Sequence, residues 1–288
     1  VVFVQDISSS IQVGNMLSSI ADDLDDAIVR QRQLARRSCA ALGPEHDAAE
    51  WHPMLAAACG YVQRIDFDRL IEVAQRNDCV IRLVHRPGGF VLENRPVAEF
   101  SRPLAAVDEQ VVRQCIVRGT HRTMEQDLEY AIAQYVEIAL RALSPAVNDP
   151  ATAISCLDWI GNSLVTLAAE PIGVAALADT AGVARVVVPV NSLRRVIAAA
   201  FNEIRQISDA SPAVSIRMMS TIEKVAPAIH EQAALDELRS QLEAVFSTAT
   251  AGARAQRDRD DIAAAHDRAV AVLDAVHPAD DPGSIATP

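Results

Sequence analysis

Aromatic residues and lysine are scarce in this sequence. Phe, Trp and Tyr make up 4% of the 288 residues, and Lys224 is the only lysine. With so few large rings, the helices must pack through Ala, Leu, Val and Ile, which permits close contacts between them. The net charge is −12, so the chain lacks the basic face that neutralises phosphates in complexes with nucleic acid. Nucleic acid is therefore excluded as a partner.

Paired cysteines and clustered histidines are also missing. The five cysteines are odd in number and form no CxxC pair (Cys39, Cys59, Cys79, Cys115, Cys156). This pattern argues against a disulfide framework and a zinc knuckle, and it predicts buried, small apolar residues in a reducing compartment. The seven histidines are dispersed, so we expect no metal site.

Long apolar runs and the common catalytic motifs are absent. No uncharged apolar run reaches the roughly 18 residues that a membrane-spanning helix needs. The chain begins without Met, on the apolar residues 1–4, and we interpret this start as the end of a longer apolar segment at a membrane boundary. The sequence contains no GxSxG, P-loop or HExxH motif and no paired dinucleotide-binding fingerprint. We therefore assign no catalytic residue.

The patterns that are present predict an α+β fold that is predominantly α-helical. Apolar residues recur at helical spacing in most of the chain, whereas β-branched runs predict a few strands. The predicted helices cover residues 7–37, 67–76, 104–118, 124–142, 150–169, 193–207, 214–226, 233–246 and 255–276. Asp66 is the predicted N-cap of the helix over 67–76. The predicted strands cover residues 60–65, 79–85, 91–92, 96–100 and 183–190.

We divide the chain into four parts on this basis. Residues 1–50 form an amphipathic helix that leads to a membrane segment outside the chain, and residues 44–53 form a polar loop. Residues 51–103 form a small β-rich module, residues 104–250 a helical domain with one extra strand, and residues 251–288 a last helix with a disordered tail.

The β-rich part allows two interpretations. The run VHRPGGFVLENRPVAEF resembles the pattern of small barrel-sandwich modules, but an ordinary small sheet packed on a helical domain fits equally well. Because no lysine lies in this part of the chain, it cannot carry a lipoyl or biotinyl group. We expect no cofactor.

The central stretch 119–159 concentrates polar residues and is predicted to form a helical hairpin. Thr123 is a candidate cap of the first helix, and Asp127 lies in its first turn, where an acid is favourable. The Ser144–Pro145 pair ends this helix. Asp149 is predicted to cap the next helix with Pro150 at its first position, and Asn148 to take a positive φ.

Capping leaves several polar residues of the hairpin unexplained. Two arginines near an exposed helix N-terminus are suited to binding a carboxylate or phosphate, while an internal Arg–Asp network that locks the hairpin is the alternative. The candidate ligand-binding residues are Arg122, Gln126, Asp127, Arg141, Asn148, Asp149 and Thr152.

Several motifs together resemble one protein family. The runs RTMEQD and IALRALSPAVNDPATAISCLDW, with SIQV, GYVQRID, RPGGFV, VARVVVP and FNEIRQ, are similar to the bacterial family of predicted integral membrane proteins called DUF2254. The resemblance implies membrane-spanning helices before this chain and a large cytoplasmic part at the bacterial inner membrane. It implies no catalytic residues.

Three functions follow as hypotheses. The first is a cytoplasmic assembly or sensing domain that forms a homo-oligomer, serves its own membrane-spanning segment and binds a small anion. The second is a hydrolase or transferase that uses Asp127, Asp149 or Asp158 with His121 as acid or base. The third is a domain that only stabilises the membrane helices, and this hypothesis predicts no ligand.

Overall fold

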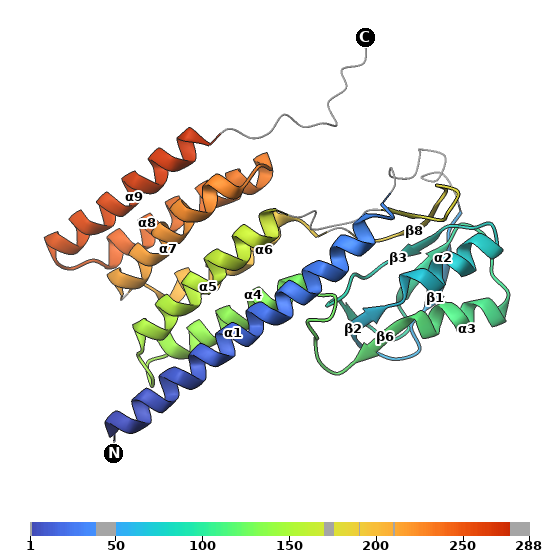
Figure 1. Ribbon diagram of the computed structural model, residues 1–288, viewed down its shortest axis with the longest axis horizontal. Coiled ribbons are helices and arrows are strands. Elements are labelled where there is room, and N and C mark those ends of the chain that lie inside the picture. Colours follow the sequence, from blue (N-terminus) through green and yellow to red (C-terminus); the bar gives the residue numbers. More distant parts are fainter. Residues whose placement is uncertain (1, 39–49, 170–175, 190, 210, 277–288) are drawn as a thin grey trace, which may run out of the picture. The chain divides into compact units, whose positions relative to one another are not determined.

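The computed structural model describes residues 2–38, 50–169, 176–189, 191–209 and 211–276, and it confirms the mainly helical α+β class (Figure 1). The helices are α1 (Val2–Ala35), α2 (Phe67–Arg76), α3 (Ala106–Cys115), α4 (Leu128–Leu143), α5 (Pro150–Ala168), α6 (Leu193–Ile207), α7 (Pro212–Val225), α8 (Gln232–Gly252) and α9 (Gln256–Ala275). The strands are β1 (His52–Leu55), β2 (Gly60–Ile65), β3 (Ile81–Leu83), β4 (Phe90–Val91), β5 (Pro96–Phe100), β6 (Ile116–Gly119), β7 (Ala176–Ala178) and β8 (Ala184–Val187).

The chain divides into two compact units. One, here called the helical unit, comprises Val1–Ala21, Ile132–Ala169 and Ser192–Pro288. The other, here called the sheet unit, comprises Asp22–Ala131 and Glu170–Asn191. Two helices, α1 and α4, each contribute residues to both units.

In the helical unit, α7 packs against α5, α8 and α9, and α6 packs against α8. The contacts are made mainly by small and aliphatic residues, as the scarcity of aromatic residues predicts. Tyr135 and Phe201 are fully buried aromatic residues among them, and the hydroxyl of Tyr135 donates a hydrogen bond of 3.1 Å to the carbonyl of Leu17. A tyrosine can be buried when its hydroxyl has a partner. The predicted disordered tail, residues 277–288, lies outside the described residues.

The sheet unit contains two sheets. The larger has the order β1-β5-β3-β8-β7, in which β3 and β8 pair in parallel and the other neighbours are antiparallel. The smaller has the order β4-β2-β6. Within residues 52–100, β1 and β3 pair with β5 and β2 pairs with β4, whereas β2 also pairs with β6 and β3 with β8 outside this segment. These outside pairings fit an ordinary sheet better than a self-contained barrel-sandwich module.

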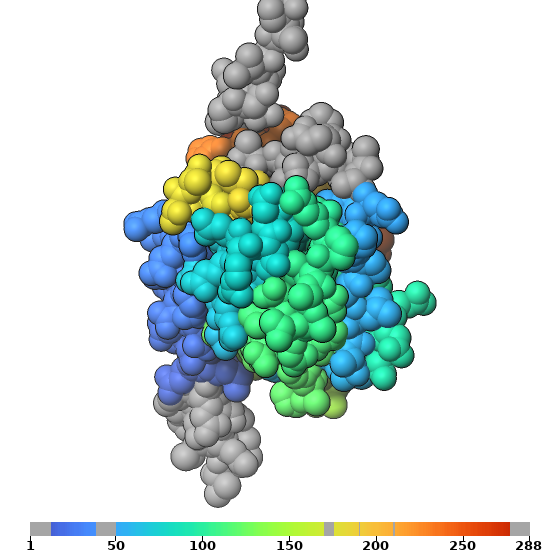
Figure 2. Space-filling view, turned by 90° about the vertical axis from the view of Figure 1, so that its right-hand side faces the viewer, coloured from blue at the N-terminus to red at the C-terminus, as the bar shows by residue number. Residues whose placement is uncertain are grey.

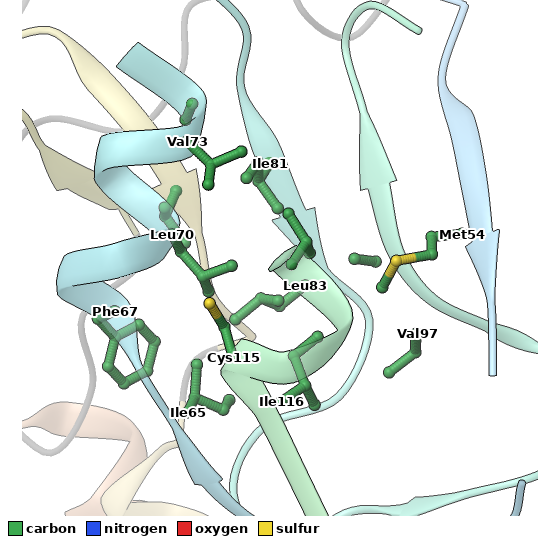
Figure 3. Packing of buried hydrophobic residues seen from close by; sticks show 14 of the residues in the cluster. Met54, Ile65, Phe67, Leu70, Val73, Ile81, Leu83, Val97, Cys115 and Ile116 are labelled. Carbon is green, nitrogen blue, oxygen red and sulfur yellow. The ribbon is translucent and has the colours of Figure 1, made fainter. Parts of the chain in front are cut away.

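Helices α2 and α3 contact each other in this unit (Figure 2, teal and green). Asp66 caps α2, as predicted. Its Oδ1 accepts a hydrogen bond of 3.1 Å from the backbone nitrogen of Arg69, the third residue of the helix. The apolar face of α2 and the end of α3 then pack with residues from both sheets. Figure 3 shows this core, with Phe67 and Leu70 of α2 near Cys115 of α3.

Several predicted elements need correction. The helix predicted over 104–118 ends at Cys115, because Ile116–Gly119 pairs with β2 as strand β6. The strand predicted over 183–190 is present as the shorter β8, but its antiparallel partner β7 was not predicted. Pairing with a distant strand outweighs local helical spacing in short segments.

Two further expectations were partly wrong. Within the loop predicted over 44–53, residues 44–49 lie outside the described residues, whereas His52 and Pro53 belong to strand β1. Cys59 is exposed, although Cys79, Cys115 and Cys156 are buried as predicted. Cys39 lies outside the described residues.

Candidate functional site

The turn between β3 and β4 is fixed to strand β2 by its backbone. The amide of Gly88 donates to the carbonyl of Val62 over 2.8 Å, and the carbonyl of Gly89 accepts from the amide of Val62 over 2.9 Å. Gly88 has a φ of +81°, which glycine adopts at little cost. The turn therefore holds the preceding residue, Arg86, at a defined place beside β2.

The segment that leads into α4 is fixed to the same strand by side chains. The carboxamide of Gln126 makes two hydrogen bonds with the backbone of Ile65: its oxygen accepts from the amide over 2.8 Å and its nitrogen donates to the carbonyl over 3.0 Å. The hydroxyl of Thr123 donates to the carbonyl of Gln63 over 3.4 Å. Gln126 thus mimics a strand partner. The helix predicted from residue 124 begins only at Leu128, and Thr123 does not act as its cap.

Asp127 is buried between these two segments. Its side chain is 1% exposed, and its Oδ2 accepts from Nε and Nη2 of Arg122 over 2.8 and 2.7 Å. A Cβ on Gly88 would lie 1.9 Å from the same oxygen, so the turn packs directly against the carboxylate. Burial raises the pKa of the Asp127 carboxyl, although Arg122 opposes this. Its Oδ1 has no hydrogen-bond partner among the described residues.

A second ion pair lies beside the first. Nη2 of Arg86 donates to Oε2 of Glu129, and both side chains are largely buried, with 20% and 13% exposed. Glu129 raises the pKa of Asp127, and Arg86 lowers it, so the two pairs act on each other electrostatically. The guanidinium of Arg122 also lies 5.0 Å from the ring centre of Tyr130, a distance at which a cation interacts with an aromatic face.

A cavity of about 100 Å³ adjoins these pairs within the sheet unit. Helix α1 lines one part of it, and the turn, the start of α4 and the residues after β8 line the rest. Its polar lining residues are Arg30, Gln31, Arg86, Gln126 and Asn191. Its apolar lining residues are Ala27, Leu34, Phe67, Pro87, Leu128, Val188 and Pro189.

Two buried polar atoms of the cavity lining have no partner among the described residues. They are Nε of Arg86, a donor, and Oδ1 of Asn191, an acceptor. Arg30 donates from Nε to the carbonyl of Glu125 over 2.8 Å. Leaving a buried donor or acceptor without a partner costs about 1–3 kcal/mol. Unpaired polar atoms around a cavity are what a site for a polar ligand requires.

The other predicted site residues belong to the helical unit and have local partners. Oδ1 of Asp149 accepts from the amides of Ala151 and Thr152 over 3.1 Å each, which confirms the predicted cap. The hydroxyl of Thr152 donates to Oδ2 of Asp149 over 2.6 Å. Asn148 has the predicted positive φ, at 49°. The exposed Arg141 pairs with Glu137 one turn earlier.

The seven predicted residues therefore fall into two groups. Arg122, Gln126 and Asp127 lie together in the sheet unit, whereas Arg141, Asn148, Asp149 and Thr152 lie in the helical unit. Sequence reasoning missed Arg86, Glu129 and Arg30. The signal for Arg86 was available, since the RPGG turn places an arginine before a tight turn. The sequence contains no such signal for Arg30, because this residue lies in a helix with many exposed charges.

The side chains proposed for acid–base chemistry also have partners. Nε2 of His121 is 3.0 Å from the hydroxyl of Thr120, and both side chains are exposed. Oδ1 of Asp158 accepts from Nη1 of Arg217 over 2.8 Å. Among the described residues, no three His, Cys, Asp or Glu side chains are grouped as metal ligands would be.

The fold and the site together define a two-unit α+β protein with a buried arginine–carboxylate cluster beside a small cavity. Residues 1–224 match the model of a family described as predicted membrane protein (DUF2254). The chain therefore belongs to this family. In the part of the chain that the structure describes, no helix has both the length and the apolar character needed to cross a bilayer.

The curated relatives carry no functional description. Proteins described as uncharacterised, one from Mycobacterium bovis and one from Mycobacterium tuberculosis, are each 25% identical to this chain over 296 residues. The alignment covers 99% of this chain and 55% of each relative, so the chain spans little more than half the length of the curated relatives it matches. No solved structure matches the chain.

Proposed function

We propose that this chain is a regulatory part of a membrane protein, located on the cytoplasmic side, which binds a small anion in the cavity of the sheet unit. One observation carries the proposal: Arg86 lines a cavity of about 100 Å³ and keeps a buried Nε without a partner among the described residues. The family description supports the membrane assignment. The cytoplasmic side follows from the resemblance of the sequence motifs.

The position of helix α1 supports a regulatory role. Ala27, Arg30, Gln31 and Leu34 of this helix line the cavity. The helix extends without a break from Val2 to Ala35, so its first turns are covalently continuous with the cavity wall. A ligand that contacts this wall stabilises the conformation of α1 in which those contacts form. Contacts that differ between two conformations are what an allosteric effector requires. The sequence motifs imply membrane helices before this one.

Assembly with a second copy is the other half of the proposal. Exposed large hydrophobic residues of the helical unit, among them Val147, Val165 and Ile207, are available for contacts between copies. Sedimentation of the 288-residue chain tests this half, and we expect a mass above that of one chain. A strict monomer over the full concentration range would remove assembly from the proposal while leaving the binding site open to its own test.

Calorimetric titration tests the binding site. The probes are acetate and inorganic phosphate at low ionic strength, because salt screens charge interactions. A dissociation constant of about 1 mM corresponds to about 4 kcal/mol, which four heavy atoms can supply at the ceiling of about 1.5 kcal/mol per atom. We expect at least one probe to bind at about this affinity.

Matched variants identify the site. Arg30→Gln removes an exposed cation of the lining and should weaken binding, and Arg86→Gln should weaken it further. Arg69→Gln is the control, because Arg69 is an exposed arginine of the same unit that does not line the cavity. Binding that is equal in all three variants, or absent for both probes in the parent chain, would refute the site.

An enzymatic role has less support from the geometry. Asp127 is buried against Arg122, Asp149 caps α5, and Asp158 pairs with Arg217. Each carboxylate is thus explained by a structural contact. Substitution of His121 together with Asp127 would abolish turnover if the hairpin were catalytic, and unchanged turnover of an identified substrate would end that hypothesis.

A further inference from the structure

We infer that the ligand of this cavity is a short-chain monocarboxylate, an anion with one negative charge and an apolar tail. The inference rests on the proposed binding function and adds the chemical class of the ligand. Three properties of the cavity lead to it: the balance of charge, the character of the walls and the volume.

The charges around the cavity leave one cation without an acid. Arg122 is paired with Asp127, and Arg86 is paired with Glu129. Each of these pairs is neutral as a whole. Arg30 donates to a backbone carbonyl, and no acid among the described residues pairs with it. In the part of the chain that the structure describes, the lining therefore carries one positive charge without a paired acid, which matches a monoanion better than a doubly charged phosphate.

The second property is the separation of polar from apolar lining. Arg30, Arg86 and Asn191 supply polar groups. The rings and aliphatic groups of Phe67, Leu128 and Val188 form apolar wall, and all three of these residues are buried. An inorganic oxyanion exposes oxygen on every side and would leave its oxygens against this wall without hydrogen bonds, which is unfavourable. A carboxylate with a hydrocarbon tail satisfies both kinds of surface.

The volume limits the length of the tail. A cavity of about 150 Å³ accepts benzene, which has six heavy atoms. The present cavity measures about 100 Å³, so on the same scale it encloses about four heavy atoms. Acetate has this size, and propionate and butyrate exceed it by one and two carbon atoms, which reach the opening of the cavity. A longer chain must leave its end in solvent, where it adds no further affinity.

A homologous series tests the inference on the 288-residue chain. The probes are acetate, propionate, butyrate, hexanoate, octanoate and inorganic phosphate, each titrated by calorimetry. Full burial of one methylene is worth about fourfold in the dissociation constant, so we expect affinity to rise from acetate to butyrate by at most about 15-fold. Hexanoate and octanoate should gain nothing more, and phosphate should bind at least about tenfold more weakly than butyrate.

Two variants connect the series to the cavity. Arg30→Gln should weaken every carboxylate by the same factor, because it removes the charge and leaves the wall intact. Leu34→Phe should reduce the space for the tail, so that the affinity stops rising at acetate or propionate. Arg30 is exposed, so its substitution leaves the chain folded even if an Arg86 variant fails to fold. Arg69→Gln should reproduce the parent series.

The outcomes separate the ligand class from the proposed function. Phosphate that binds more tightly than butyrate, with the same loss in Arg30→Gln, overturns the monocarboxylate and leaves a small-anion site standing. Affinity that continues to rise through octanoate overturns the short-chain limit and points to a lipid chain. Absence of binding for every probe, or binding that ignores Arg30→Gln, overturns the proposed site together with this inference.

Discussion

Substitution of Gly88 by alanine provides the sharpest test of the buried cluster. Gly88 has a φ of +81°, and a Cβ there would lie 1.9 Å from Oδ2 and 2.5 Å from Cγ of Asp127. The left-handed backbone alone costs alanine about 1–2 kcal/mol. The carboxylate must also move, although it is almost fully buried and bonded to Arg122.

Gly182 is a matched control for this substitution. It lies in the same unit and has a φ of +80°, but a Cβ there meets nothing within 4 Å. Gly182→Ala should therefore cost only about 1–2 kcal/mol from the backbone. Breaking a buried ion pair costs about 3–5 kcal/mol, and the partial exposure of Arg122 reduces this to about 2 kcal/mol. We expect Gly88→Ala to cost about 3–4 kcal/mol in total.

The two tryptophans allow the sheet unit to be followed separately. Trp51 lies in the sheet unit, where Arg82 stacks 3.9 Å from its ring centre, and Trp159 lies in the helical unit. In a Trp159→Phe background, the fluorescence of Trp51 during urea unfolding reports the sheet unit. If Gly88→Ala and Gly182→Ala lower the free energy of unfolding of the sheet unit by amounts that agree within about 0.5 kcal/mol, the packing of the turn on Asp127 is refuted.

A double-mutant cycle then assigns the excess cost to the carboxylate. When Asp127 is already shortened to alanine, no carboxylate opposes the new Cβ at Gly88. Gly88→Ala should then cost about what Gly182→Ala costs, so the coupling should equal the excess of about 2 kcal/mol. A coupling near zero would place the clash elsewhere in the turn.

The remaining predictions use the same unfolding assay. The pKa of Asp127 is raised in the folded state, so its contribution to stability is present below the ordinary pKa near 3.9 and is lost as pH rises through the raised pKa. Asp127→Asn should remove this dependence, and an unchanged pH profile between the two proteins would contradict the burial argument. Gln126→Leu should cost about 2 kcal/mol through two lost hydrogen bonds and should expose the amide of Ile65 to hydrogen exchange, whereas a still-protected amide would disprove the strand mimicry. Asp149→Ala should cost about 1 kcal/mol as a lost helix cap, Asp149→Ser should retain most of that stability, and equal losses for both would show that Asp149 does more than cap.

The candidate site illustrates where sequence reasoning ends. Capping rules operate within a few residues of the chain, so Asp66 and Asp149 could be assigned as caps from the sequence, and the structure confirms both. The choice between an anion site and an internal network at Arg122 depends on what lies opposite the guanidinium. The structure places Asp127 there, only five residues away. The same polar residue types would allow either arrangement.

The position of Gln126 shows why local patterns can also mislead. Its segment has helical spacing, yet the carboxamide bonds to the backbone of Ile65, 61 residues earlier in the chain. These hydrogen bonds hold the segment outside the helix, and α4 begins only at Leu128. A long-range hydrogen bond leaves no periodic trace in the sequence. The start of the helix was therefore misplaced by four residues.

The sequence by itself determined the α+β class, most of the helices, the caps at Asp66 and Asp149 and the family, because these depend on local periodicity, capping chemistry and long specific motifs. The tertiary structure decided which strands pair, which arginine lies opposite which carboxylate, and that a cavity adjoins Arg86. Several of these features depend on residues far apart in the sequence: Arg86 and Glu129 are 43 positions apart, and β3 pairs with the much later β8. Their contacts form only when the chain packs, since burial and pairing energies exceed the local preferences of short segments.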